Sequence, residues 1–393
     1  MDAFFASVAI RDRPDLWHHP VAVGGGARGV VTCANYPARA YGVKAAMPGG
    51  MARRLCPQLV SVGLDFGEVS TVSKAVREIF RRATPAVEVV SVDEAFLDVS
   101  GAIRLFGTPQ QIAERIRRQI REELRITCSV GVAATPSVAK VASRRAKPDG
   151  VVVVTPEEIP RFLHPLDVGE LYGVGPSTRA RLRRLGFETV GDIARTPPAT
   201  LEQILGARLG GHLHRLATGT DRRRVIGYSD RMSLRLGESG PDLPDRSTGA
   251  QETFARDLSD RADIVRELLR LSARVTRRMR RSGAVGRTVC LTVRFTDFTT
   301  ITRSRTLPDP TDVTTEVHAV AVRLLDELRL RGRPLRLVGV RVEGLRAREG
   351  AERQLVLGER ERGWSHADRA IDQVTDRFGT QLVRRASLIE RRR

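Results

Sequence analysis

The sequence predicts a protein of several domains in the α/β class, and three observations lead to this fold class. The chain has 393 residues, enough for roughly two to four domains that each bury a core of their own. Short β-branched runs alternate with stretches of helical period in residues 1–165 and again in residues 249–345. Residues 166–228 contain helical stretches only. We therefore expect an α/β unit with a mixed sheet, then a helical unit, then a second α/β unit.

The composition indicates a polyanionic partner. The formal net charge is +20, because 66 Lys and Arg residues face 46 Asp and Glu residues. No apolar run reaches the roughly 20 residues that a membrane-spanning helix needs, and we identify no signal peptide. The four cysteines form no CxxC pair, which favours reduced thiols over zinc ligands or disulfides. We expect a cytoplasmic protein that does not bind a membrane.

The first 44 residues combine short strands with aromatic and basic side chains. The apolar start, which contains Phe5, is expected to be the end of a strand that runs into a helix. Short strands are expected at residues 21–23 and 29–33. The segment that follows carries Tyr36 and Arg39. It is typical either of an amphipathic surface helix or of a small module that contacts phosphates.

Asp93 and Glu94 are adjacent, between two short buried strands expected at residues 88–92 and 95–99. Neighbouring residues on a regular strand point to opposite faces, so both carboxylates can face one site only at a turn or bulge. A carboxylate pair in apolar surroundings needs a cation, and Mg²⁺ takes oxygen ligands of this kind. A solvated hairpin turn is the alternative, and the two residues taken alone favour it.

Helices at residues 70–82 and 112–124, a strand at 128–133, a helix at 137–146 and a strand at 151–154 are expected to complete the first unit. Lys140 and Lys147 lie close to a loop that ends in Pro148-Asp149-Gly150. These lysines are either solvated surface residues or ligands of a triphosphate.

The helical unit contains the segment Gly173-Val174-Gly175 immediately before an expected helix. Such a turn opens onto a helix N-terminus, where free backbone N–H groups can bind a DNA phosphate. A plain helical hairpin with glycine caps is the alternative. Residues 229–248 are rich in Gly, Pro, Ser and Asp, as is typical of a linker.

The second α/β unit is expected to form a small open sheet with helices on one face, leaving the other face free for a nucleic-acid backbone. Its first helix, residues 264–279, is rich in arginine, which indicates either a further nucleic-acid contact or a solvated face. The charged tail contains one apolar segment, residues 354–358. This segment either docks on a partner as an extended peptide or packs on its own domain.

Six segments, in this order along the chain, resemble the Y-family translesion DNA polymerases of the DinB, or DNA polymerase IV, type. They are residues 2–8, 33–39, 91–98, 146–150, 173–175 and 354–357. The resemblance implies a right-hand architecture and a low-fidelity, mutator DNA polymerase that acts in translesion synthesis and DNA repair. It also implies Mg²⁺ (two ions) as cofactor, and primer-template DNA, dNTP and a sliding clamp as partners of a monomer.

The implied domains follow the expected units. Palm and fingers would occupy residues 1–165, with the fingers at about 12–65, and a helix-hairpin-helix thumb would occupy residues 166–228. A linker at residues 229–248 would lead to the little finger at residues 249–345. The tail, residues 346–393, would carry the clamp-binding peptide 354–358.

The resemblance also implies roles for single residues. Asp93 would ligate both metal ions, and Glu94 would ligate the ion at the primer end and assist deprotonation of the 3′-OH. Phe5 matches the aromatic steric gate that excludes a ribose 2′-OH. The other matches are the triphosphate ligands Tyr36, Arg39 and Lys147, the DNA-binding glycines Gly173 and Gly175, and the clamp-binding residues Gln354, Leu355 and Leu357.

The match departs from the family at its start. The family's palm begins with a strand that ends in Asp-x-Asp, whose first aspartate is the third metal ligand, whereas here Met1 occupies the x position. Asp2 is two residues further along, about 7 Å on a strand, too far for a direct metal bond. We therefore expect an upstream strand with the third ligand in a longer protein. The alternative is a non-catalytic DNA- and clamp-binding accessory protein that lost this aspartate.

Overall fold

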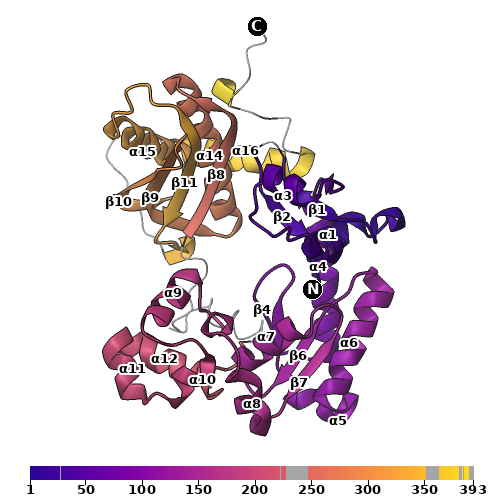
Figure 1. Cartoon of the computed structure of the whole chain (residues 1–393). Helices are drawn as coiled ribbons and strands as arrows, with labels where there is room; N and C mark the ends of the chain where they lie inside the picture. Colours follow the sequence, from indigo (N-terminus) through magenta and orange to yellow (C-terminus); the bar gives the residue numbers. More distant parts are fainter. Residues whose placement is uncertain are drawn as a thin grey trace. The chain divides into compact units, whose positions relative to one another are not determined.

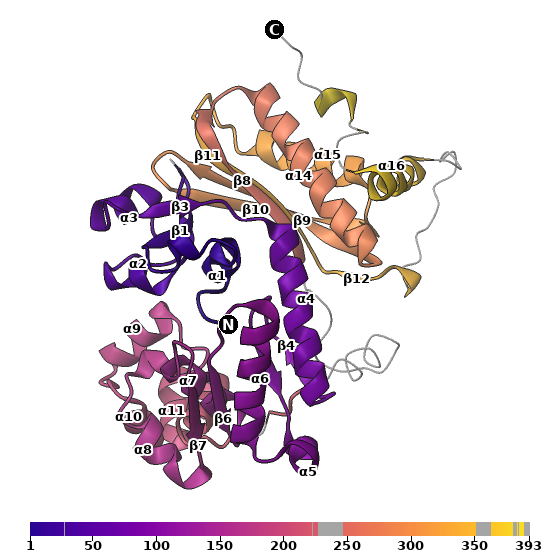
Figure 2. The ribbon, with the colours of Figure 1, turned by 90° about the vertical axis from the view of Figure 1, so that its right-hand side faces the viewer.

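The computed structural model describes residues 1–26, 28–221, 223–226, 247–350, 363–379, 383 and 385–388. The chain forms two compact units, residues 1–237 and 238–393 (Figures 1 and 2). The linker expected at residues 229–248 lies outside the described residues, except that Ser247 and Thr248 open a strand. Peptide 354–358 lies outside them entirely. Within the described ranges, no helix is long and apolar enough to cross a membrane.

The first unit begins with a helix and not with a strand, because helix α1 (Phe4–Ile10) starts directly after Ala3, whose φ of 43° is left-handed. A three-stranded sheet in the order β2-β1-β3 follows, with β1 antiparallel to β2 and parallel to β3. Its strands and the helices on it are β1 (Val21–Gly24), β2 (Val31–Ala34), α2 (Tyr36–Ala40), α3 (Gly49–Leu55) and β3 (Val60–Val62). Small buried side chains, including Ala22, Ala38 and Ala52, form its core.

The rest of the α/β region has two further sheets of two strands each. Strands β4 (Val87–Val89) and β5 (Ala95–Leu97) pair antiparallel, and β6 (Val130–Ala133) and β7 (Val151–Val154) pair parallel. The expected helices are confirmed as α4 (Phe66–Ala83), α6 (Pro109–Leu124) and α7 (Pro136–Arg145). Helices α4 and α6 contribute Val72, Ile79, Ile112 and Ile120 to one core.

The expected mixed sheet is present as β2-β1-β3, but the acidic hairpin and the β6-β7 pair are not part of it. The backbone of residues 1–2 lies between the two-stranded sheets: the Met1 amine donates to the carbonyl of Asp93 at 2.8 Å, and the Asp2 N–H donates to the carbonyl of Thr127 at 3.1 Å. One hydrogen bond on each side is too few for a ladder, so the sheets stay separate.

Short helices complete the first unit. They are α8 (Ile159–Leu163), α9 (Pro176–Arg184), α10 (Val190–Arg195), α11 (Pro198–Leu205) and α12 (Ala207–Ala217). Leu182, Ile193, Leu201 and Leu213 form their core, which also takes in Val138 and other side chains of α7. Helix α7 is thus fixed on both sides, against β6 and β7 and against the helical region.

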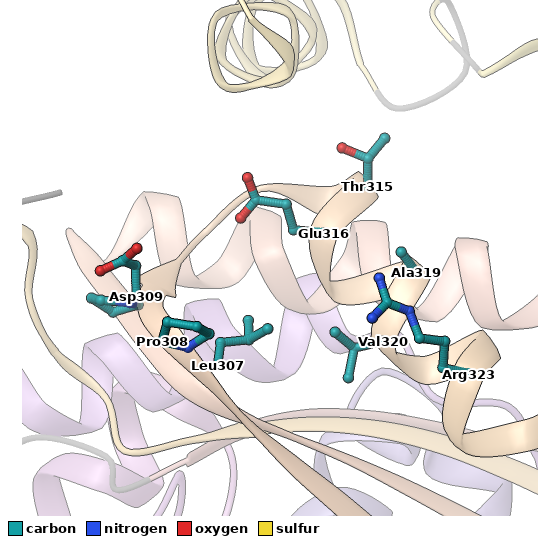
Figure 3. A pocket seen from close by; sticks show the side chains of 9 residues that line it. Leu307, Pro308, Asp309, Thr315, Glu316, Ala319, Val320 and Arg323 are labelled. Carbon is teal, nitrogen blue, oxygen red and sulfur yellow. The ribbon is translucent and has the colours of Figure 1, made fainter. Parts of the chain in front are cut away.

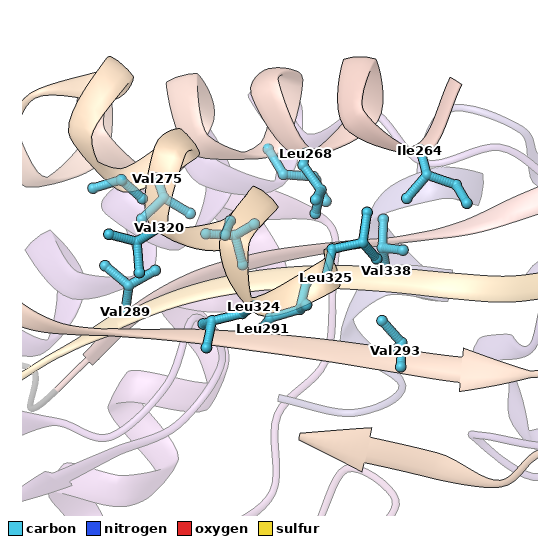
Figure 4. Close-up of a cluster of buried hydrophobic side chains, with 14 of the residues drawn as sticks. Ile264, Leu268, Val275, Val289, Leu291, Val293, Val320, Leu324, Leu325 and Val338 are labelled. Atoms are coloured by element: carbon cyan, nitrogen blue, oxygen red, sulfur yellow. The ribbon is translucent and has the colours of Figure 1, made fainter. Parts of the chain in front are cut away.

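The second unit is an antiparallel sheet in the order β10-β9-β11-β8, as expected from two strand-helix-strand halves. Helices α14 (Arg261–Arg281) and α15 (Thr314–Glu327) pack on one face, where Leu268, Val275, Leu291 and Val338 lie in the core (Figure 4). The strands are β8 (Ser247–Leu258), β9 (Ala284–Phe295), β10 (Thr300–Thr311), β11 (Leu335–Glu343) and the short β12 (Arg346–Ala347). Strand β8 was not expected, because Phe254 is its only buried side chain.

A further helix, α16 (Trp364–Phe378), packs against α14 and α15. It brings acidic side chains onto the arginine-rich helix: Asp372 pairs with Arg280 at 2.6 Å, and Asp376 pairs with Arg277 at 2.7 Å. Arg277 and Arg280 therefore hold the tail helix, whereas Arg274 and Arg278 on the same helix stay exposed.

Candidate active site

Asp93 and Glu94 lie in the turn between β4 and β5, which confirms that the two residues are outside the regular strands. The N–H groups of Val90 and Ser91 both donate to the Glu94 carbonyl, at 2.9 and 3.1 Å. The Ser91 hydroxyl donates to the Asp93 carboxylate at 2.7 Å. From α4, the Ser73 hydroxyl donates to the carbonyl of residue 92 at 2.6 Å. The turn is therefore fixed by its own backbone and by a neighbouring helix.

The Glu94 carboxylate forms an ion pair with Lys140 of α7. Burial raises the pKa of Glu94, but the hydrogen bond and charge of Lys140 more than offset it, so the pKa lies below its ordinary value. Glu94 is therefore ionised at neutral pH, and its side chain is still 39% exposed. An ionised, accessible carboxylate beside a second one can bind a cation.

Met1 and Asp2 connect the acidic turn to the loop after α7. Lys147 donates to the Met1 carbonyl at 2.8 Å, and the Met1 amine bonds the backbone of Asp93. The buried Asp2 carboxylate accepts from the Ser129 hydroxyl at 2.8 Å and from the Asp149 N–H at 2.9 Å. Asp2 thus holds chain segments together through its carboxylate.

Tyr36 and Arg39 lie on α2, where the Asn35 side chain caps the helix by accepting from the Ala38 N–H. The Arg39 guanidinium lies 4.8 Å from the centre of the Tyr36 ring. Burial and the nearby Asp2 carboxylate raise the pKa of Tyr36 to about 12, so its hydroxyl stays protonated. That buried hydroxyl has no hydrogen-bond partner of good geometry in the described part of the chain, Asp2 included.

Phe5 is half-buried at the start of α1. Its ring centre lies 5.8 Å from that of Phe4, and it packs against a small buried cluster that includes Val23 and Cys33, as Tyr36 also does. The expected sugar-contacting ring and the expected phosphate-binding hydroxyl therefore belong to the same packed group. Through Asp2 and Met1, that group adjoins Lys147 and the acidic turn.

The carboxylates fit a hard divalent cation but do not form a complete metal cage. Nowhere in the described ranges do three or more His, Cys, Asp or Glu side chains gather closely enough to hold a metal ion. Asp93 and Glu94 supply oxygen ligands only, which suits Mg²⁺ completed by water and substrate phosphates.

The candidate DNA-binding glycines lie at the start of α9. Gly173 has a φ of +84°, which a glycine adopts without strain, and Gly175 is the N-cap of the helix. A Cβ atom at either position would meet nothing within 4 Å, so the turn is open. Arg179 and Arg183 on α9 both bind Asp167, at 2.7 and 2.6 Å.

The sheet face of the second unit that is not covered by helices carries threonine and arginine side chains. Thr288 pairs with Thr306 at 2.9 Å, and Arg294 donates to Thr300 at 2.9 Å. Hydroxyl and guanidinium groups are suited to phosphate contacts.

On the helical side of the second unit, a pocket of about 360 Å³ lies between β10 and α15 (Figure 3). It is lined by Leu307, Asp309, Glu316 and Arg323 among others, and it contains no expected site residue.

Sequence reasoning missed Lys140 as a partner of Glu94 and Ser129 as a partner of Asp2. Lys140 lies on α7 (Pro136–Arg145) and Lys147 in the loop after it, so helical spacing does not relate the two lysines and gives no signal for Lys140. Nothing in the sequence near Ser129 marks it.

The comparisons with known proteins cover nearly the whole chain. The impB/mucB/samB family matches residues 1–144, its C-terminal domain matches residues 245–357, and a DNA polymerase-iota thumb domain matches residues 169–221. A DNA polymerase IV 2 of Mesorhizobium japonicum is 40% identical over 98% of this chain and 91% of its own. A DNA polymerase IV of Desulfatibacillum aliphaticivorans is 39% identical over 99% of this chain and 95% of its own.

Solved structures agree with these matches. A Y-family DNA polymerase chimera of Dbh and Dpo4 is similar with a TM-score of 0.74 and 25% identity, over 88% of this chain and 97% of its own. DinB from Sulfolobus solfataricus gives a TM-score of 0.55 with 26% identity, over 87% of this chain and 96% of its own. The expected α/β architecture with a helical thumb and a separate C-terminal domain is confirmed.

Proposed function

The chain belongs to the impB/mucB/samB family of Y-family DNA polymerases, and we propose that it performs nucleotidyl transfer at Asp93 and Glu94. Relatives of about 40% identity along the whole chain are DNA polymerases IV, so the chain is a low-fidelity, DNA-directed DNA polymerase of the translesion type. This confirms the polymerase expected from the sequence. The non-catalytic accessory protein receives no support.

The reaction joins the primer 3′-OH to the α-phosphorus of a dNTP and releases pyrophosphate. Y-family polymerases depend on divalent metal, and our proposal is that Asp93 holds two Mg²⁺ ions and Glu94 the one at the primer end. When bound, two such ions stabilise the attacking and leaving oxygens of an in-line displacement. Glu94, which is ionised and partly exposed, would assist removal of the 3′-OH proton.

The triphosphate would be held by Tyr36, Arg39 and Lys147. The support for Tyr36 is its protonated hydroxyl, which lacks a partner of good geometry within the described ranges and can donate to a phosphate oxygen. Arg39 stacks on the same ring, and Lys147 lies beside Met1 on the side of the acidic turn. Phe5, which packs against the same buried cluster as Tyr36, would exclude a ribose 2′-OH.

Primer-template DNA would be bound at two places, each described within its own unit. One is the open turn of Gly173 and Gly175, and the other is the threonine- and arginine-rich sheet face of the second unit. We propose the same domains as before: palm and fingers at residues 1–165, thumb at 166–228 and little finger at 249–345. We also propose that the enzyme is monomeric and cytoplasmic, and that Gln354, Leu355 and Leu357 bind a sliding clamp.

The observation that carries the proposal is the meeting of four expected residues, Asp93, Glu94, Lys147 and Tyr36, around Met1 and Asp2. The test is primer extension on undamaged and lesion-containing templates with Mg²⁺, comparing the parent with Asp93→Ala and Glu94→Ala. We expect extension by the parent and none by either variant, with primer-template affinity retained. Extension by a variant within tenfold of the parent would place the chemistry elsewhere.

A further inference from the structure

Lysine is rare in this chain, yet two lysines lie close enough to the acidic turn to act on the charge of Glu94. Of the 66 Lys and Arg residues only four are lysines, and two of these are Lys140 and Lys147. Arginine forms bidentate, rigid pairs with carboxylates, whereas a lysine ammonium is a compact charge on a flexible stem. In a chain that uses arginine almost everywhere, lysine at these two positions points to chemistry that arginine does not supply.

The contact between Lys140 and Glu94 is built by a rigid framework. Helix α7 buries Val138 and Val141. It lies so close to β6 that a Cβ atom on Gly131 would collide with the backbone of the helix. The backbone of Lys140 is therefore fixed, while its side chain, 21% exposed, reaches the carboxylate from the side of the helix.

We propose that Lys140 acts on the metal site through Glu94: its ammonium group occupies the Glu94 carboxylate until a divalent cation binds, and then gives way. The inference rests on the proposed metal site at Asp93 and Glu94. A bound dication repels an ammonium group at contact distance, so the two cannot share one carboxylate oxygen. The flexible lysine stem lets the ammonium move aside to solvent or to a substrate phosphate, which a bidentate arginine would resist.

The test is Mn²⁺ binding to the protein without substrate, followed by the electron paramagnetic resonance signal of free Mn²⁺. In Lys140→Arg, the stronger pair should weaken Mn²⁺ binding by about threefold, and in Lys140→Met the absence of a competing cation should strengthen it by about threefold. Extension kinetics supply the second readout: at saturating Mg²⁺, Lys140→Arg should recover the kcat of the parent, whereas at limiting Mg²⁺ it should be slower.

Three controls separate the possible failures. Lys74→Arg, on the exposed side of α4, should leave Mn²⁺ binding unchanged. Asp93→Ala should reduce Mn²⁺ binding, and if it does not, then the proposed metal site itself is wrong. If Asp93→Ala reduces binding but Lys140→Arg matches the parent, or Lys140→Met binds Mn²⁺ more weakly, then only the role of Lys140 is overturned. Thermal unfolding of each variant shows that the proteins compared are folded.

Discussion

Two acidic clusters, one in each unit, are built from the same side chains but differ in how completely their charges are met. In the first unit, Glu94 is 39% exposed and faces a single lysine. In the second unit, the Asp368 side chain is 3% exposed and accepts hydrogen bonds from the Thr314 N–H at 2.8 Å, from Arg280 at 3.3 Å and from Arg385. The open cluster keeps oxygen atoms available for a ligand, whereas the closed one is filled by the chain.

The closed cluster shows what a purely structural carboxylate looks like in this protein. Helix α15 begins after Val313, which has no side-chain cap, and Asp368 of α16 bonds the first N–H of that helix instead. Arg280 also donates to the carbonyl of Asp312 at 2.7 Å. Each of the three donors to Asp368 comes from the chain itself. The contrast indicates that incomplete pairing, and not acidity alone, distinguishes the proposed metal and substrate site.

The largest effect should come from breaking the open cluster. Asp93→Ala or Glu94→Ala should lower the rate of primer extension by at least roughly 10²-fold, as loss of one preorganised charge-stabilising group does. The free energy of unfolding should change by less than about 0.5 kcal/mol, because the turn is solvent-accessible and its backbone bonds stay. Single-turnover extension and urea unfolding measure the two quantities on the same samples. A loss of unfolding free energy well above about 0.5 kcal/mol that accompanies the loss of rate would show that this cluster is structural as well.

Breaking the closed cluster should do the opposite. Asp368→Ala removes a buried acceptor shared by Arg280, Arg385 and the Thr314 N–H, and should destabilise the second unit by about 3 kcal/mol. Extension by the folded protein at saturating DNA should be unchanged. Asp376→Ala is the matched control, because it removes an exposed acid from the same helix and should have little effect on stability. Similar unfolding curves for the two variants would mean that burial of Asp368 does not matter.

These two clusters also show what the sequence could and could not reveal. The acidic turn was predictable, because short strands flank Asp93 and Glu94 and a turn is the only way to point both carboxylates at one site. The partners were not predictable: Lys140 contacts Glu94 from 46 positions away, and Asp368 caps a helix that begins 54 positions earlier. No local period encodes such pairs. Strand β8 was missed for a related reason, since its alternation is mostly polar and its pairing with β11 is long-range.

A third change tests a ring that borders the open site. Phe5→Ala should raise ribonucleotide incorporation relative to deoxyribonucleotide by roughly tenfold to a hundredfold, because the space taken by the ring would accept a 2′-OH. Single-nucleotide kinetics with matched dNTP and rNTP measure the ratio. The fully buried neighbour Phe4 is the control, and Phe4→Leu should affect stability without changing sugar choice. An unchanged ratio in Phe5→Ala would leave that ring a core residue only.

Clamp binding should be independent of both clusters. Changing Leu355 and Leu357 together to alanine should weaken binding to a sliding clamp by about 2 kcal/mol, a typical loss for anchor residues. Extension on naked primer-template and the stability of the second unit should stay as in the parent. Titration of the clamp with parent and variant measures the affinity, and equal affinities would exclude this segment as the docking peptide.

The smallest effect should come from removing the hydroxyl of Tyr36. This change distinguishes a group that is kept for a ligand, as in the open cluster, from one that is bonded within the fold, as in the closed cluster. Removing a group from the closed cluster leaves its hydrogen-bond partners unsatisfied. Tyr36→Phe instead removes a buried hydroxyl with no well-formed hydrogen bond in the described ranges, so the free energy of unfolding should stay the same or rise slightly. The loss should appear only with substrate, as a KM for dNTP about fivefold higher, the equivalent of one hydrogen bond of about 1 kcal/mol.

The pH dependence of this effect follows from the raised pKa of Tyr36, about 12. Because the hydroxyl stays protonated far above neutrality, the ratio of KM values between parent and Tyr36→Phe should be constant from pH 7 to about pH 10. Steady-state kinetics across that range, with urea unfolding in parallel, measure both halves of the prediction. A variant that loses stability and keeps its KM would show that the hydroxyl already has its partner within the fold, and Tyr36 would then belong with the closed cluster.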